Sequence, residues 1–71
     1  MDMANIRLND ADEAILQHLR DGRVTAAFLA KRTDWEREYL TQRLIRLDEH
    51  DLVQNLEGVG LYELLDEPVQ A

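Results

Sequence analysis

The chain has 71 residues, a length that fits one small domain. It contains no cysteine, which excludes disulfide bonds and thiolate metal sites as sources of stability. Its 15 acidic residues outnumber 8 Lys and Arg, so the formal charge of −7 has the wrong sign for attraction to nucleic-acid phosphates. A chain this small, without cross-links, depends on close helix packing or on a second subunit, and a homodimer is therefore expected.

The charge is unevenly distributed along the chain. Residues 7–46 hold all eight cationic residues and seven acidic ones, whereas residues 47–71 hold seven acidic residues and no Lys or Arg. A single Lys beside seven Arg favours an acid-rich surface adapted to a salt-rich cytoplasm, over an ordinary acidic interaction module. No apolar run reaches the roughly 18 residues of a membrane span, and residues 1–8 lack signal-peptide features, so a cytoplasmic protein is expected.

The first predicted element is a helix that begins after Asn9. Asn9 is a favourable N-cap, and Asp12 and Glu13 place negative charge near the positive end of the helix dipole. Gly22 is expected to end the helix. Residues 1–8 would form a short N-terminal arm. The apolar stripe of this helix comprises Ala11, Ile15, Leu16 and Leu19.

The next segment predicts a helix-turn-helix. After a short extended pair at residues 23–24, Thr25 can cap a helix over 26–32, with Leu29 and Ala30 facing inward. Residues 33–35 form the turn, in which Trp35 is expected to wedge between helices. A longer helix over 36–50 follows, and two helices joined by a short turn define this motif. Its apolar stripe comprises Leu40, Leu44 and Leu47.

The last third of the chain predicts a β-hairpin. Strand-like runs at 52–56 and 61–65 flank a four-residue loop, 57–60, that contains two glycines. Helix, short strand, helix, helix and hairpin is the order of a winged helix. The sequence therefore predicts a mainly helical α+β winged helix-turn-helix domain over 9–65, with an acidic tail over 66–71.

These elements together resemble a known family over about residues 8–65. The positions that carry the resemblance are Asp12, 14–16, Leu19, Thr25, 29–30, 39–40, 43–44, Leu47, 51–53 and 60–64. They resemble haloarchaeal winged-helix regulators similar to the repressor of the phage phi-H, and more distantly the MarR and ArsR families. The resemblance implies a sequence-specific DNA-binding transcription regulator, often dimeric, without metal or cofactor, and repression is the expected outcome.

Two positions depart from that family pattern. Glu36 stands where related proteins begin the recognition helix with Ser or Thr, and its carboxylate would repel phosphate. The loop 57–60 offers no basic residue to the DNA backbone. Both departures leave the predicted fold unchanged but weaken the case for DNA affinity.

The exposed face of the helix over 36–50 carries the candidate chemistry. At 100° per residue, the face opposite the leucine stripe and its flanks hold Glu38, Tyr39, Thr41, Gln42, Ile45 and Arg46. Gln42 can pair with adenine, Arg46 with guanine or phosphate, and Glu38 with the amino group of cytosine.

The flanks of this helix supply the remaining candidates. Arg37 and Arg43 suit phosphate contacts, and Thr41 suits a base or phosphate oxygen. Tyr39 fits a phosphate contact or a lid on the core equally well. The predicted DNA-contacting residues are Arg37, Glu38, Tyr39, Thr41, Gln42, Arg43 and Arg46.

The sequence offers no enzyme signature. His18 and His50 lie 32 residues apart, and the chain contains neither Ser nor Cys, so no familiar zinc spacing or common nucleophile is present. No catalytic, metal or cofactor site is predicted. His18 is expected to be a solvated helix residue. His50 is expected to interact favourably with the negative end of its helix dipole.

Two other functions remain open. A protein-interaction module that has lost DNA binding would use the acidic wing and outward apolar residues, while Tyr62 and Leu64 pack inward. The apolar residues expected to face outward are Ile45, Val59, Leu61 and Leu65. DNA mimicry by the acidic face is a third reading, which the mixed charges of the helical half disfavour.

Overall fold

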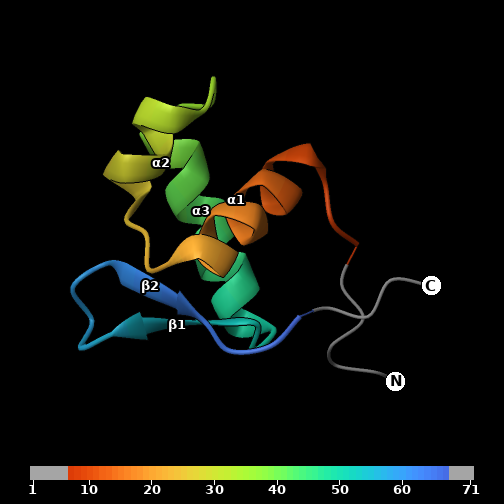
Figure 1. Ribbon diagram of the computed structural model, residues 1–71, viewed down its shortest axis with the longest axis vertical. Coiled ribbons are helices and arrows are strands. Elements are labelled where there is room, and N and C mark those ends of the chain that lie inside the picture. The colour runs from red at the N-terminus through yellow and green to blue at the C-terminus, as the bar shows by residue number, and fades with distance from the viewer. Residues whose placement is uncertain (1–6, 68–71) are drawn as a thin grey trace.

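The computed structural model describes residues 7–67, so most of the predicted arm and most of the predicted tail lie outside the described residues. The elements are α1 (Asp10–Asp21), α2 (Ala26–Arg32), α3 (Arg37–Glu49), β1 (Val53–Leu56) and β2 (Leu61–Leu64). The three helices stand over one end of a β-hairpin, with α1 crossing in front of α3 (Figure 1). This is the predicted α+β winged-helix layout.

A reciprocal cap fixes the start of α1. The Asn9 side chain accepts a hydrogen bond from the Asp12 backbone N–H at 2.8 Å, and the Asp12 carboxylate accepts one from the Asn9 N–H at 3.1 Å. Two of the unpaired N–H groups at this helix end are thereby satisfied. The helix ends at Asp21, and Gly22 donates its N–H to the Leu19 carbonyl. The predicted bounds of this helix are confirmed.

The helix-turn-helix forms as the sequence predicts. Thr25 caps α2 by accepting from the Phe28 N–H at 3.0 Å, and the Thr33 hydroxyl donates to the Leu29 carbonyl at 2.8 Å. The helix α3 is one residue shorter at each end than predicted. Glu36 is its N-cap, in extended conformation and without a side-chain cap hydrogen bond, and His50 is its C-cap. The hydrogen bond that a Ser or Thr side chain could accept at this position is therefore absent, as expected from the presence of Glu36.

The hairpin is antiparallel, and its register runs from Val53 opposite Leu64 to Leu56 opposite Leu61. Each strand is one residue shorter than predicted. Val24 exchanges two backbone hydrogen bonds with Tyr62, at 3.0 and 2.7 Å, which confirms the extended pair before α2. The polypeptide between α1 and α2 is thus tied to β2.

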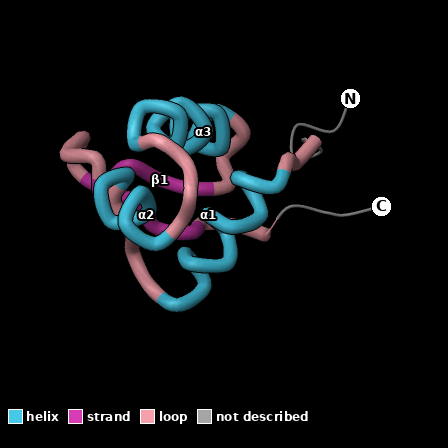
Figure 2. Tube along the Cα trace, turned by 90° about the horizontal axis from the view of Figure 1, so that it is seen from above, coloured by secondary structure: helices cyan, strands magenta, loops and turns pink. Residues whose placement is uncertain are grey.

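The core lies between the helices and the hairpin. Seen from above, α3 lies on one side and α1 and α2 on the other (Figure 2). Trp35 and Leu64 are partly buried and pack against the core, as predicted, and Tyr62 is buried. Ile45, Val59 and Leu65 are exposed, as predicted. The core consists of Ile15, Leu16, Leu19, Val24, Leu29, Leu40, Leu44, Leu47, Leu52, Val53 and Tyr62.

Two expectations for single side chains need adjustment. Leu61 is half-buried, so the proposed outward stripe of the hairpin is less exposed than its alternation suggests. His18 is half-buried as well, and its ring lies edge-on to the ring of Phe28 with 6.2 Å between the ring centroids. Within residues 7–67, no helix has the length and apolar character needed to cross a bilayer.

Candidate nucleic-acid interface

The helix α3 has one fully buried face and one exposed face. Its three inward leucines have no solvent exposure. The residues on the opposite side, which are all exposed, are Glu38, Gln42, Ile45, Arg46 and Glu49. We call Glu38, Gln42, Ile45 and Arg46 the outer face of α3. Because the helix is held by its leucines and by α2, this face is presented on a rigid element.

The polar side chains of the outer face are weakly engaged with the rest of the protein. Arg46 approaches Glu49 at 3.7 Å, and both side chains are more than half exposed. Gln42 makes no hydrogen bond to any other described side chain. An exposed ion pair of this kind contributes little to stability, so the Arg46 guanidinium is available to a ligand. The Gln42 amide is available as well, because it has no hydrogen-bond partner among the described side chains.

Arg37 and Thr41 lie one turn apart on the flank of this face. Arg37 is exposed and forms no ion pair with a described residue. The half-buried Thr41 donates its hydroxyl to the Arg37 carbonyl at 2.9 Å. Its proton is therefore committed, and the hydroxyl oxygen remains as an acceptor.

Arg43 and Tyr39 point toward α1 instead of the outer face. Arg43 donates two hydrogen bonds to Asp12, from Nε at 2.7 Å and from Nη2 at 2.6 Å. Asp12 is completely buried, and the Arg43 side chain is 23% exposed. Tyr39 is half-buried, and its hydroxyl accepts a hydrogen bond from Asn9 at 2.9 Å. The structure thus places two of the seven predicted contact residues in a polar joint between helices.

This polar joint, defined by Asn9, Asp12, Tyr39 and Arg43, has a clear electrostatic consequence. Hydrogen bonding to Asp12 outweighs desolvation and raises the pKa of the Arg43 guanidinium above its ordinary value. The bidentate geometry is the strong form of an Arg–carboxylate pair. Removing either partner would leave a charge without compensation at a largely buried site.

The role of Asp12 in this joint was missed by sequence reasoning, which assigned it only to the helix dipole. A signal was present, because Asp12 stands three and four residues before Ile15 and Leu16, within the apolar stripe of α1. A carboxylate at such a position must be buried, and a buried carboxylate needs a cationic partner. The sequence contains eight cations, and spacing alone does not identify which one pairs with Asp12.

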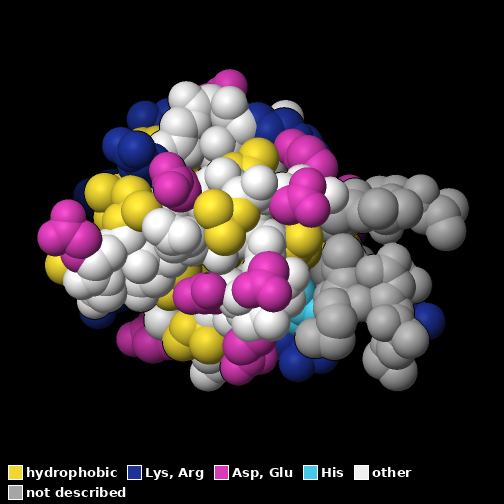
Figure 3. All heavy atoms as spheres, turned by 90° about the horizontal axis from the view of Figure 1, so that it is seen from below, with side chains coloured by type: hydrophobic (Ala, Val, Ile, Leu, Met, Phe, Trp, Pro, Cys, Tyr) yellow, Lys and Arg dark blue, Asp and Glu magenta, His cyan; other side chains and the backbone are white. Residues whose placement is uncertain are grey.

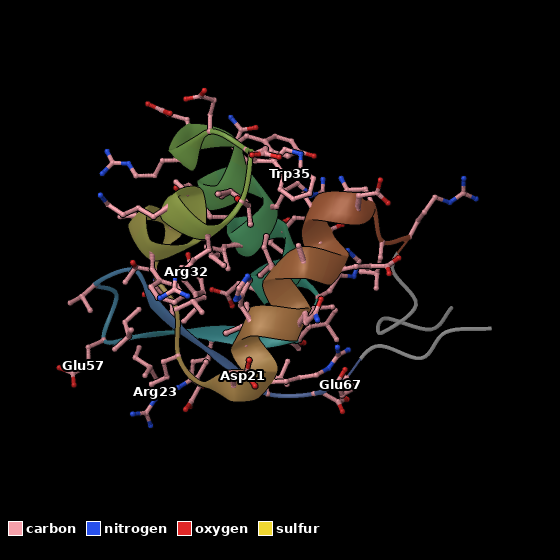
Figure 4. The ribbon with its side chains drawn as sticks, turned by 45° about the horizontal axis from the view of Figure 1, so that its top comes forward. Asp21, Arg23, Arg32, Trp35, Glu57 and Glu67 are labelled. Carbon is pink, nitrogen blue, oxygen red and sulfur yellow. The ribbon has the colours of Figure 1, made fainter. Side chains whose placement is uncertain are left out.

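A second surface feature lies between the end of α1 and α2. The Arg32 guanidinium stacks on the exposed ring of Phe28, 4.7 Å from its centroid. Arg32 projects from α2 on the side where Asp21 and Arg23 lie (Figure 4). A hollow of about 270 Å³ is lined by His18, Asp21, Gly22, Arg23, Val24, Phe28 and Arg32. The spacing of Phe28 and Arg32, one helical turn apart, could have predicted the stacked pair.

The hairpin side of the molecule is acidic. Its described cationic neighbours come from the helical half, through Arg20 paired with Glu67 at 2.8 Å and Arg23 paired with Glu63 at 3.3 Å. Seen from below, acidic and hydrophobic side chains are interspersed, and Lys and Arg lie mainly at the margins (Figure 3). Within residues 7–67, no group of three His, Cys, Asp or Glu side chains could hold a metal ion.

The fold and this surface define a winged-helix domain of the α+β class, with a polar outer face on the second helix of its helix-turn-helix. No protein-family model, curated protein or solved structure matches the chain.

Proposed function

We propose that the protein is a sequence-specific regulator of transcription that binds double-stranded DNA by placing α3 in the major groove. It acts as a repressor in the cytoplasm, and two copies bind a palindromic site. The observation that carries the proposal is the outer face of α3, where Gln42 and Arg46 are exposed and weakly engaged. The resemblance to haloarchaeal winged-helix regulators supports the same function.

The outer face offers direct base contacts in the major groove. Gln42 donates to adenine N7 and accepts from its N6 amino group, and Arg46 donates to guanine O6 and N7. Glu38 accepts from the amino group of cytosine. Arg37, at the first turn of α3, supplies a phosphate contact that orients the helix without specifying sequence. Arg43 and Tyr39 act from the inner side, by holding α3 against α1.

The charge of −7 fits this function in concentrated salt. At about 1 M salt the Debye length is roughly 3 Å, so repulsion between the acidic hairpin and DNA is screened. Counterion release supplies little affinity under these conditions. Binding then depends on short-range base contacts, and the affinity should fall less steeply with added salt than that of a basic repressor.

The direct test is DNA binding by the purified protein to the promoter fragment upstream of its own coding sequence, titrated in potassium chloride. A variant carrying Gln42→Ala and Arg46→Ala is expected to lose at least tenfold in affinity, because each good base contact contributes about 1–3 kcal/mol. Circular dichroism in the same buffer establishes that both proteins are folded.

The matched control for this test lies on the outer side of α1. Gln17→Ala with Arg20→Ala removes the same two residue types and the same charge, from two exposed positions away from α3. This control should bind within about twofold of the unaltered protein, since neither position lies on α3 and the exposed Arg20–Glu67 pair that it removes contributes little to stability. Equal losses in both variants, or no binding by the folded protein, would refute the proposal.

A second candidate is a protein-interaction module, which the acidic hairpin side favours. Every charged residue from 48 to 67 is acidic, and Val59 and Leu65 are exposed there, at 72% and 50%. Such a surface fits a basic partner with apolar side chains. The DNA titration separates the candidates: a folded protein that binds no promoter DNA would favour this second function.

A further inference from the structure

Ile45 is the one apolar residue on the outer face of α3. Its side chain is 47% exposed, while the residues beside it on that face are polar or charged. Thr41 and Gln42 precede it by four and three residues, so they are its neighbours on the helix surface. The aliphatic side chain therefore stands next to the Gln42 amide, which is suited to hydrogen-bond with a DNA base.

Ile45 is not part of an apolar patch on this helix. The other large hydrophobic residues that are exposed within residues 7–67 belong to other elements: Phe28 to α2, Val59 to the hairpin loop and Leu65 to the segment after β2. A single aliphatic side chain among charged groups is much smaller than the core of a protein interface. Its surroundings fit a mixed polar and apolar surface, and the major groove presents such a surface.

The apolar group that the major groove presents is the C5-methyl group of thymine. We infer that Ile45 is a specificity-determining residue that contacts this methyl group, next to an adenine bound by Gln42. The inference rests on the proposed DNA-binding function and adds a base preference to it. The part of the site beneath the middle of α3 should then contain A·T pairs.

The experiment compares two versions of the promoter fragment, amplified with either thymidine or deoxyuridine triphosphate. Uracil pairs as thymine does and lacks only the methyl group, and amplified DNA contains no 5-methylcytosine, the other source of this group. The unaltered protein should bind the uracil fragment about fourfold more weakly for each methyl group contacted, the effect of one buried methyl-sized group. The Ile45→Ala variant should bind both fragments equally.

Leu65→Ala provides the matched control, since Leu65 is similarly exposed but lies outside α3. It should keep the full preference for thymine. Two results would overturn the inference alone: binding of both fragments equally by the unaltered protein, or retention of the preference by Ile45→Ala. The first comparison needs no variant, so it decides even if Ile45→Ala fails to fold. Absence of binding to either fragment would overturn the proposed function as well.

Discussion

Two arginines three residues apart on α3, and therefore neighbours on the helix surface, are used in different ways. Arg43 faces α1 and makes two short hydrogen bonds to a carboxylate with no solvent exposure. Arg46 faces outward and makes one long contact with an exposed glutamate. The residue type and the helix are the same, so the difference comes from the partner. A buried carboxylate on α1 assigns Arg43 to the fold and leaves Arg46 available for a ligand.

The largest expected effect concerns the buried side of this comparison. Replacing Asp12 by alanine removes the cap on the Asn9 N–H and leaves the Arg43 guanidinium unpaired. We expect a loss of about 3 kcal/mol in the free energy of unfolding, measured by urea denaturation. Asp10→Ala is the control, because Asp10 is exposed in the same turn. It should cost less than about 0.5 kcal/mol, and equal losses would contradict the assigned role of the joint.

A smaller effect is expected at the start of α3. Glu36 is the N-cap but makes no cap hydrogen bond, and serine there can accept one from the first turn. Glu36→Ser should therefore raise the free energy of unfolding by about 0.5 kcal/mol, after the loss of a favourable charge near the helix dipole. Glu38→Ser, inside the helix, should lower it. Thermal unfolding of the three proteins tests this prediction. If the unfolding temperatures of both variants shifted in the same direction, the capping role of position 36 would be disproved.

The smallest effect concerns an exposed ion pair. Hydrogen bonding to Arg20 lowers the pKa of Glu67 below its ordinary value of 4.5. Because this pKa is lowered in the folded state, the pair contributes fully to stability above the ordinary pKa of 4.5. The contribution is lost as the pH falls through the lower pKa of the folded state. Glu67→Gln should slightly flatten the decline in stability as the pH falls below the ordinary pKa of 4.5. Molar salt should abolish the difference between the two proteins.

The elements could be predicted because their signals are local. Asn9 and Thr25 mark the starts of α1 and α2 within a few residues, and the glycines of the loop 57–60 mark the hairpin. The polar joint could not be predicted in the same way. Asp12 and Arg43 are 31 residues apart, and their pairing depends on the packing angle between α1 and α3. Sequence spacing therefore located the outer face of α3 but did not identify the arginine that faces inward.

The most direct test of this difference compares the substitutions Arg43→Gln and Arg46→Gln, each of which removes one positive charge from α3. The free energy of unfolding and the DNA affinity per folded molecule are measured for both. We expect Arg43→Gln to lose about 3 kcal/mol of stability, because it leaves the Asp12 carboxylate buried without its cationic partner. This variant should bind DNA almost normally, because the outer face of α3 is unchanged. Arg46→Gln should keep its stability within about 0.5 kcal/mol and lose about tenfold or more in affinity. The reverse pattern, or loss of DNA affinity in both variants alike, would contradict the assignment of Arg43 to the fold and of Arg46 to DNA binding.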